Sequence, residues 1–583
     1  MVSVVNLSGN QNIDGVLWGW KYDAGDPFTY SFPTSTAEYS AYAAVNGFQA
    51  FNAAQQTAVR YTFGLLASYI PRTFTETTAD FARFRFAEAS TINYTNDPNV
   101  ARFTGLHQLG NSGTAEATPP ELAFGGLAPT TPAFAQGDSW YTSGIYETPS
   151  LGTFSLQAGI MHETGHNMGL KHGHASQSGH GVTFPALPTD RDSYEFSIMT
   201  YRQFVGDPPN SDTAPHHATT YQINDIAALQ YLYGANFATN SGGTTYSWNN
   251  TTGEYFINGV SQGRPSTGNY VLMSIWDGGG ADTYFLGNFT SNLTIDLRPG
   301  GGGIIMPGLA ANLGEGQFAR ASVYNAYLYN GNTASLIENA YGGTGSDAIY
   351  GNQAANYLYG GAGGDSLVGN DGTDQLAGEA GVDYIYGGND GDAISGGLDG
   401  DNLSGDGGND YILGENGNDA IAGGAGSDVI DGGDNNDTLW GHDPSGAGDA
   451  GDLINGGNGD DIIVGHVGGD RLYGGAGQDT ISGGNDGDVI YGESGNDNLY
   501  GGAGGDAFVF ATFGFGADNI WDFTPGQDKI YMSTALFANF AAVQAAAVGG
   551  PGVTVITQPG GGGQIALQGF GLSALSANDF TFF

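Results

Sequence analysis

The chain has no cysteine and few basic residues: 14 Lys and Arg stand against 59 Asp and Glu in 583 residues, for a net charge of −45. The lack of cysteine excludes disulfide bonds, so folding does not depend on a redox compartment. The negative charge excludes nucleic acid and anionic membranes as expected partners, because both would repel it. No long apolar run and no basic-then-apolar start are present, so we expect neither a membrane span nor a classical signal peptide.

One short segment, HETGHNMGLKH, carries three histidines and one glutamate. His162 and His166 are four residues apart, which places both imidazoles on one face of a helix. Gly169 allows the helix to stop and the chain to bend, so that His172 becomes a third ligand. Three neutral nitrogens would leave one zinc position open to water, and Glu163 is placed to accept its proton. The segment predicts zinc-dependent amide hydrolysis.

A second motif, SIMTY at residues 197–201, has the form of the Met-turn that accompanies the long zinc motif in metzincins. Met199 would pack beneath the metal, and ordinary core packing is the alternative. His174 is the main rival to His172 as a ligand, but only His172 has the metzincin spacing. The remaining histidines receive no ligand role: His107, His180, His216, His217, His442 and His466.

Residues 1–240 resemble the catalytic domain of the serralysin family, the calcium-dependent secreted metzincins of bacteria. Four further segments support the resemblance: 17–19, 28–32, 137–140, which is similar to the strand bordering the family's substrate cleft, and 225–234. The resemblance implies that Tyr201 binds the single catalytic zinc at rest and swings away to stabilise the oxyanion. A buried tyrosine with a satisfied hydroxyl is the alternative.

Residues 342–510 repeat the pattern GGxGxDxUx, where U is a large apolar residue. We count 18 units; the unit from Gly441 carries six extra residues, the sixth position is Asp in all units except at Asn356, and the eighth is Ile or Leu until Phe508. Glycines allow the turns, aspartates and turn carbonyls bind calcium, and the apolar residues point inward from short strands. We predict a parallel β-roll, since a disordered acidic tract would not need the apolar column.

Calcium is expected in this segment because 27 Asp and 3 Glu stand against the single base Arg471, a net of 1 − 30 = −29, and uncompensated carboxylates on adjacent turns repel one another. Residues 276–283 are similar to the segment that forms the first calcium site of serralysins, with an Asp-Gly-Gly hairpin turn as the alternative. The predicted calcium ligands are Asp277, Asp282, Asp347, Asp365, Asp374, Asp383, Asp392, Asp401, Asp410, Asp419, Asp428, Asp437, Asp452, Asp461, Asp470, Asp479, Asp488, Asp497 and Asp506.

The expected fold is an α+β metzincin catalytic domain followed by an all-β parallel β-roll, an RTX solenoid. The expected domains are residues 1–245, catalytic; 246–341, a β-rich connector; 342–510, the roll; and 511–583, a C-terminal cap. Within the first, we expect a long helix over 48–68. Its apolar residues lie mainly on one side: Phe51, Ala58, Tyr61, Leu65 and Leu66. We expect a second helix over 225–233, stopped by Gly234.

The expected function is a secreted zinc endopeptidase that acts on proteins or peptides and is stabilised by calcium. Residues 577–583 resemble the C-terminal signal read by type I secretion machinery; a final β-strand is the alternative reading, and the two are compatible. An inhibitor protein is a further candidate partner. The competing hypothesis is a calcium-dependent surface or matrix protein, attached to the cell surface, whose metzincin domain is weak, self-processing or vestigial. The intact Glu163 and histidines favour the peptidase.

Overall fold

The computed structural model describes residues 2–39, 44–78, 82–93, 107–108, 115–117, 138–141, 146–179, 182–209, 214–266, 268–442 and 450–583. His180, Gly137 and the segment 443–449 of the long repeat unit lie outside the described residues. The chain divides into two compact units. The first comprises Met1–Phe285 and Arg298–Ile337, and the second comprises Leu286–Leu297 and Glu338–Phe583. The first unit therefore contains the expected catalytic segment together with most of the expected connector.

A small sheet forms the frame of the first unit, in the strand order β10-β11-β7-β3-β6 with β5 also paired to β7. Its strands are β10 (Ala115–Ala117), β11 (Asp138–Tyr141), β7 (Phe84–Glu88), β3 (Phe28–Ser31), β6 (Phe74–Glu76) and β5 (Gln49–Ala50). The strand β11 runs parallel to β7 and antiparallel to β10. Among the described strands β10 is therefore the edge, and β11, which we expected at the border of the cleft, lies one position inside it.

The long helix α2 spans Ala53–Tyr69 and begins later than the expected residue 48. Asn52 fixes its start, because its side chain accepts from the backbone of Gln55 while the Gln55 side chain accepts from the Asn52 backbone, a reciprocal capping arrangement. The preceding residues form the strand β5. Phe63 is buried by α2 against the sheet, where its ring stacks on those of Tyr30 and Phe74 at centroid distances of 4.6 and 4.8 Å.

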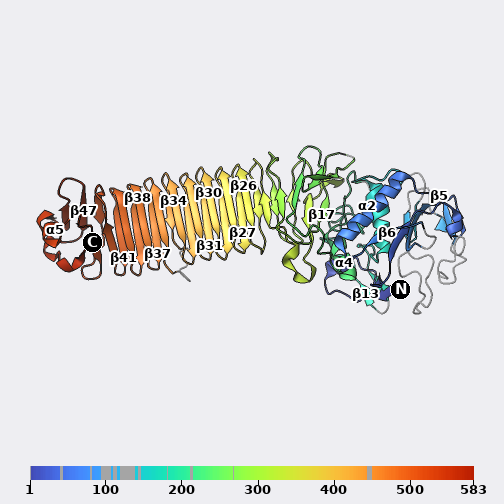
Figure 1. The fold of residues 1–583 in the computed structure, drawn as a ribbon, viewed down its shortest axis with the longest axis horizontal. Helices are drawn as coiled ribbons and strands as arrows, with labels where there is room; N and C mark the ends of the chain where they lie inside the picture. Colours follow the sequence, from blue (N-terminus) through green and yellow to red (C-terminus); the bar gives the residue numbers. More distant parts are fainter. Residues whose placement is uncertain are drawn as a thin grey trace. The chain divides into compact units, whose positions relative to one another are not determined.

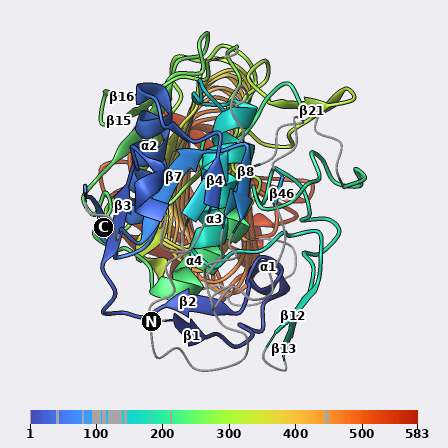
Figure 2. The same ribbon diagram turned by 90° about the vertical axis from the view of Figure 1, so that its right-hand side faces the viewer.

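Two further helices complete this unit, and they can be followed beside the sheet strands in Figure 2. The helix α3 (His162–Asn167) continues a π-helical segment over Ser155–Met161. The helix α4 (Ile223–Tyr233) is buried along nearly its whole length and ends at Gly234, which has a φ of 85°. This left-handed conformation is available to glycine without steric cost, so the predicted helix stop at Gly234 is confirmed.

The rest of the first unit is a set of short strands. Their bounds are β14 (Thr245–Trp248), β15 (Tyr255–Ile257), β16 (Val260–Gly263), β17 (Met273–Ile275), β18 (Thr283–Phe285), β20 (Ile304–Ile305) and β23 (Val323–Asn325). The strands β14, β15 and β16 form an antiparallel meander, while β17 runs parallel to β23. In the described part of the chain, no helix has the length and apolar character needed to cross a bilayer.

The second unit is the predicted parallel β-roll, visible in Figure 1 as the ladder of yellow and orange strands from β26 to β41. Each strand pairs in parallel with the strand two units later, so that Leu358 lies beside Leu376 and Leu367 beside Ile385, 18 residues apart. Two nonapeptides therefore make one turn. Where the long unit intervenes, Ile430 pairs with Ile454, 24 residues later. The insertion is thus absorbed without a break in the ladder.

The regular strands of the roll are β25 (Ala348–Tyr350), β26 (Tyr357–Ala362), β27 (Ser366–Asp371), β28 (Gln375–Ala380), β29 (Tyr384–Asn389), β30 (Ala393–Leu398), β31 (Asn402–Gly407), β32 (Tyr411–Asn416), β33 (Ala420–Ala425), β34 (Val429–Asp434), β35 (Thr438–Trp440), β36 (Leu453–Asn458), β37 (Ile462–Val467), β38 (Arg471–Gly477), β39 (Thr480–Asn485), β40 (Val489–Gly495), β41 (Asn498–Ala503) and β42 (Ala507–Phe510). The apolar column, from Ile349 to Phe508, is at most 3% exposed. These side chains form the core that no single repeat could bury alone.

The chain ends in a cap that continues the parallel pairing. Its elements are β43 (Gly516–Ile520), β44 (Lys529–Met532), α5 (Phe540–Ala546), β45 (Ala547–Gly550), β46 (Val553–Thr557), β47 (Gly563–Gln568) and β48 (Phe580–Phe582). The strand β48 pairs in parallel with β44, and Phe580 is buried. The last residues are therefore a β-strand in the folded protein, which is the alternative reading of this segment.

Candidate metal centre

Three imidazoles converge at the end of α3. The Nε2 atom of His172 lies 3.0 Å from Nε2 of His166 and 3.2 Å from Nε2 of His162. Within the described residues, these three histidines are the one group of three or more His, Asp or Glu side chains whose ligand atoms gather closely enough for a metal ion. Tetrahedral zinc with nitrogen ligands at its usual bond length separates those nitrogens by about 3.3 Å. The spacing of the donors therefore fits zinc.

Backbone carbonyls orient two of these rings. The Nδ1 atom of His162 is 2.8 Å from the carbonyl oxygen of Ile198, and Nδ1 of His166 is 2.8 Å from that of Leu170. A carbonyl can only accept, so Nδ1 carries the proton in each ring and Nε2 keeps its lone pair. Such outer partners commonly fix the tautomer of a metal-binding histidine.

Burial keeps the three rings neutral. It lowers the pKa of His162 to about 4 and, together with the neighbouring His162, that of His166 to about 3. Burial and the adjacent imidazoles also lower the pKa of His172 strongly. Because only a neutral imidazole offers a lone pair, protons do not compete with a metal at neutral pH. The neutral state of the three imidazoles and the spacing of their Nε2 atoms both suit a metal ion.

The turn after α3 brings His172 to the cluster. Gly169 has a φ of 96°, the left-handed conformation predicted for it, and the Leu170 N–H donates to the Gly165 carbonyl at 3.0 Å. The buried Lys171 side chain stabilises the loop that follows α3. Its Nζ donates to the carbonyl oxygens of Gly15 at 2.5 Å and Ala175 at 2.7 Å. Only 1% of Lys171 is exposed, and burial lowers its pKa to about 8. Sequence reasoning missed this residue.

Glu163 and Tyr201 lie beside the cluster. Glu163 is 7% exposed and follows the first ligand on α3. The Tyr201 ring lies 4.4 Å from that of His172 and 5.7 Å from that of His162, measured between centroids. Burial, and then the charge of Glu163, raise the pKa of Tyr201 to about 12, so its hydroxyl keeps its proton. The structure thus brings all five residues predicted for the zinc site together.

The Met-turn supports the cluster from below. Met199 is fully buried, and a Cβ atom added to Gly165 would lie 2.7 Å from the Met199 sulfur. Asp225 of α4 secures the turn: its carboxylate accepts from Ser197 Oγ at 2.6 Å and from the Ile198 N–H at 2.8 Å. Burial raises the pKa of Asp225 to about 7. The sequence predicted Asp225 only as part of a helix and did not predict its contact with the Met-turn.

The other histidines do not join the cluster in the described residues. His174 is the nearest, with its ring 5.4 Å from that of His172 and 4.9 Å from that of Tyr201. It therefore borders the site, as predicted, without reaching the point where the three Nε2 atoms meet. His216 stacks on Tyr270 at 3.8 Å. The remaining described histidines are His107 in β9 (His107–Gln108), His217 in the first unit, and His442 and His466 in the second.

Asp277 and Asp282 form a buried pair in the first unit. They are 1% and 0% exposed, and their side chains lie close enough to hydrogen bond with each other. The Tyr246 hydroxyl donates to Asp277 at 2.5 Å, and the Thr244 N–H donates to Asp282 at 2.8 Å. Burial raises the pKa of Asp277. Two buried carboxylates in contact share either a proton or a cation, so calcium at this pair stays a prediction.

The aspartates of the roll form two regular columns. Each backbone N–H donates to the carboxylate one turn later, for example from Asp383 to Asp401 at 2.8 Å. The second oxygen, Oδ2, is buried and has no hydrogen-bond partner among the described residues in Asp365, Asp374, Asp383, Asp392, Asp401, Asp410, Asp419, Asp437, Asp461, Asp479, Asp488 and Asp506. Hard carboxylate oxygens of this kind are the ligands that calcium prefers. The donor set therefore fits the ion.

Burial, followed by the charges of neighbouring aspartates, raises the pKa of these groups, to about 7 in Asp365 and about 8 in Asp488. Two positions differ from the rest. Asp347 already accepts backbone hydrogen bonds at both oxygens, from Leu293 and Gly343, at 2.7 Å each. At Asn356, an amide replaces the carboxylate, and its nitrogen donates to the Glu338 carbonyl at 2.9 Å. At the N-terminal end of the roll, the polar side-chain atoms of these two residues therefore form more of their hydrogen bonds with the protein itself.

Comparison with known proteins agrees with both features. The family model of the RTX calcium-binding nonapeptide repeat matches residues 335–367, 368–403, 395–430, 413–443, 446–481 and 473–508. Metallopeptidase AprA of Pseudomonas marginalis is 33% identical over 56% of this chain and 60% of its own length. Serralysin of Proteus mirabilis is 29% identical over 58% of this chain and 62% of its own length.

A solved structure of the extracellular lipase LipA from Serratia marcescens matches 34% of this chain with a TM-score of 0.19 and 21% identity, a similarity too low to carry an argument. The class of protein is thus one with RTX calcium-binding repeats and a cluster of three histidines whose geometry fits a metal ion. The chain is similar to these two metallopeptidases, and its matched part spans 60% and 62% of their length.

Proposed function

We propose that this protein is a zinc endopeptidase that cleaves peptide bonds of extracellular proteins and whose folded state depends on calcium. The observation that carries the proposal is the meeting of three neutral Nε2 atoms beside Glu163. His162, His166 and His172 would hold the zinc, with Tyr201 as a further ligand at rest. The relatives named metallopeptidase and serralysin support the same assignment.

Bound zinc would supply Lewis-acid activation of a water molecule and of the scissile carbonyl. The Glu163 carboxylate would act as the general base: it accepts a proton from the attacking water and later passes that proton to the leaving amine. Tyr201 keeps its proton well above neutral pH, so its hydroxyl can donate a hydrogen bond to the developing oxyanion. Trp18 packs its ring edge-on against His166 at 5.5 Å and helps to fix that ligand.

The decisive experiment compares casein hydrolysis by the full chain, loaded with calcium and one equivalent of zinc, with that of Glu163→Gln. The substitution keeps the shape of the side chain and removes the base, so we expect at least a 10²- to 10⁴-fold loss of kcat, the usual contribution of a general base. Zinc content and circular dichroism should match those of the wild type. A zinc chelator should abolish the activity, and added zinc should restore it.

The opposite outcome would be equally clear. If the folded, zinc-loaded wild type hydrolyses casein and a panel of unfolded proteins no faster than Glu163→Gln, the peptidase proposal is wrong. The calcium-binding surface protein would then be the better description, and the roll would be its working part.

We also propose that the protein is exported through a type I secretion system. The RTX repeats and the acidic-then-aromatic end at residues 577–583 support this route. Low calcium would leave the roll unfolded for passage, and external calcium would then drive folding, because an ion that binds only the folded state stabilises it. A chain whose roll is fully folded without calcium, by circular dichroism, would contradict this mechanism.

A further inference from the structure

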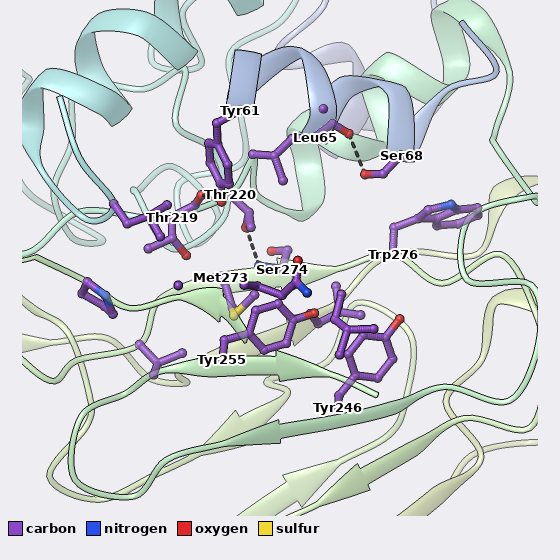
Figure 3. A pocket seen from close by; sticks show the side chains of 18 of the residues that line it. Tyr61, Leu65, Ser68, Thr219, Thr220, Tyr246, Tyr255, Met273, Ser274 and Trp276 are labelled. Atoms are coloured by element: carbon purple, nitrogen blue, oxygen red, sulfur yellow. Dashed lines mark hydrogen bonds between the residues drawn. The ribbon is translucent and has the colours of Figure 1, made fainter. Parts of the chain in front are cut away.

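A cavity lies in the first unit, and its lining does not include the metal centre. Its volume is about 350 Å³, and it is bounded by α2 and by the segments that form β14 to β17. This volume is at the lower end of the range for small-molecule sites. Figure 3 shows Tyr61, Leu65 and Ser68 reaching toward it from the helix, opposite Tyr255 and Met273. None of the zinc-site residues lines it.

The polar groups of the wall are largely used by the protein itself. The Tyr61 hydroxyl donates to the Thr219 carbonyl at 2.8 Å, and the Tyr246 hydroxyl donates to Asp277 at 2.5 Å. Ser68 donates to a carbonyl of its own helix at 2.6 Å. The surface left for a ligand consists mainly of aromatic rings and aliphatic side chains. An apolar body would therefore be accepted, and a polar one would find few partners.

A glycine in α2 keeps this space open. Gly64 is in the interior of the helix and lines the cavity. A Cβ atom added there would meet nothing within 4 Å, and the backbone does not adopt a positive φ. Glycine costs a helix interior about 1 kcal/mol relative to alanine. Neither close packing nor backbone conformation requires that cost, and this exposed position leaves open space beside the cavity that a larger side chain would occupy.

A single cation stands at the cavity. Arg264 is the only charged residue among those that line it, and its side chain is exposed. No acidic partner pairs with its guanidinium in the part of the chain that the structure describes. Basic residues are scarce in this chain, at 14 in 583. An unpaired arginine beside an apolar cavity favours a ligand with an anionic end.

We propose that this cavity binds a small amphipathic acid: an apolar body, aromatic or aliphatic, held between α2 and the β14–β17 segment, with its carboxylate on Arg264. Aromatic acids and medium-chain fatty acids share this chemistry. The proposal is independent of the peptidase assignment, because no residue of the zinc site takes part. Trp276, which lines the cavity, provides a fluorescent reporter of binding.

The test is calorimetric and fluorescence titration of the calcium- and zinc-loaded full chain with three probes: 2-naphthaleneacetate, octanoate and the neutral 2-naphthaleneethanol. We expect one site per chain for at least one of the acids, and the two acid arms identify which body is preferred. Arg264→Gln should weaken acid binding about fivefold, the upper range of an exposed ion pair, and leave the neutral alcohol unchanged. Gly64→Leu should abolish binding of all three probes by filling the cavity.

Gly64→Ala is the matched control, since it restores helix propensity while adding a single carbon, and it should bind like the wild type. Zinc content, circular dichroism and casein hydrolysis verify that each variant is folded. Two results overturn the proposal. One is that neither acid binds the wild type. The other is that the acids bind Gly64→Leu or Arg264→Gln as tightly as they bind the wild type.

Discussion

The two units of this protein arrange their candidate metal ligands in opposite ways. The first assembles one site from residues that occur once, at the end of α3, in the turn after it and in the Met-turn. The second repeats one aspartate and one apolar residue from turn to turn, so that each site resembles its neighbours. One substitution in the first unit can therefore abolish the chemistry of its site, because that chemistry depends on a few residues. In the second unit each substitution should lower the stability only in part, because many repeats contribute to it.

Burial also acts differently on the two sets of ligands. It lowers the pKa of His162 to about 4, which leaves the imidazole ready for a metal at neutral pH. It raises the pKa of Asp365 to about 7, which keeps a proton on a ligand that must lose it before calcium binds. Zinc binding should therefore be nearly independent of pH around neutrality, while calcium binding to the roll should release protons.

The largest expected effect comes from removing one zinc ligand. His172→Ala leaves two imidazoles, and we expect loss of stoichiometric zinc and at least about a 10³-fold loss of casein hydrolysis, because activation of water by the metal disappears. Metal analysis and single-turnover kinetics provide the measurement. His216→Ala, which removes a histidine outside the cluster, is the control and should keep the full zinc content. Unchanged activity in His172→Ala would mean that another side chain completes the site.

A core substitution in the roll tests whether its stability is spread evenly over the repeat units. Ile421→Ala removes a fully buried side chain from the apolar column and should lower the free energy of unfolding by about 2–5 kcal/mol. Urea titration in calcium measures the loss. Because successive repeat units carry the same residue type, Ile412→Ala, one unit earlier, should cost a similar amount. A much larger loss at one of the two positions would show that the repeats are not equivalent.

Tyr201→Phe separates the oxyanion role from ordinary packing. The ring contacts with the histidines remain, but the hydroxyl is lost, and we expect kcat to fall by about 10²-fold, as when one oxyanion donor is removed. KM and zinc content should change little. Kinetics with a fluorogenic peptide measure both constants. A fall in stability with unchanged kcat would instead support the reading of Tyr201 as a buried aromatic residue.

The smallest expected effect is the change of stability with pH in the calcium-free roll. The folded pKa is raised from the model-compound value of 3.8 to about 6 in Asp383 and to about 8 in Asp488, so the folded state binds protons that the unfolded chain releases. The resulting stability is complete below about pH 4 and is lost as pH rises through 6 to 8. Without calcium, calorimetry should show a roll that is folded in acid, with a Tm that falls over this interval until the roll is unfolded near neutral pH, as the secretion proposal requires.

Saturating calcium should reverse the trend, because the ion replaces the protons and binds more tightly as they leave. A calcium-free roll whose Tm rises between pH 5 and 8 would contradict the raised pKa values. Asp225 offers a contrast within the first unit: its pKa is also raised by burial, to about 7, but its oxygens are held by the Met-turn.

Much of the fold followed from local pattern. The spacing of His162 and His166 and the glycine at 169 depend on helix and turn geometry within a few residues, and the structure has both. The nonapeptide period predicted the roll for the same reason, since each position in the unit has one steric or ligand role. The start of α2 was predicted less well, because the Asn52 cap is stronger than the apolar pattern that precedes it.

The sequence by itself therefore determined which histidines come together in one cluster and how the second unit repeats, because neighbours along the chain decide helical faces and turn conformations. The tertiary structure alone decided that Asp225 holds the Met-turn, that Lys171 ties the third ligand to Gly15, and that β10 covers β11. It also decided that Gly64 lines a cavity together with residues of β14–β17. Each of these contacts joins segments far apart in the chain, whose meeting depends on how the whole core packs.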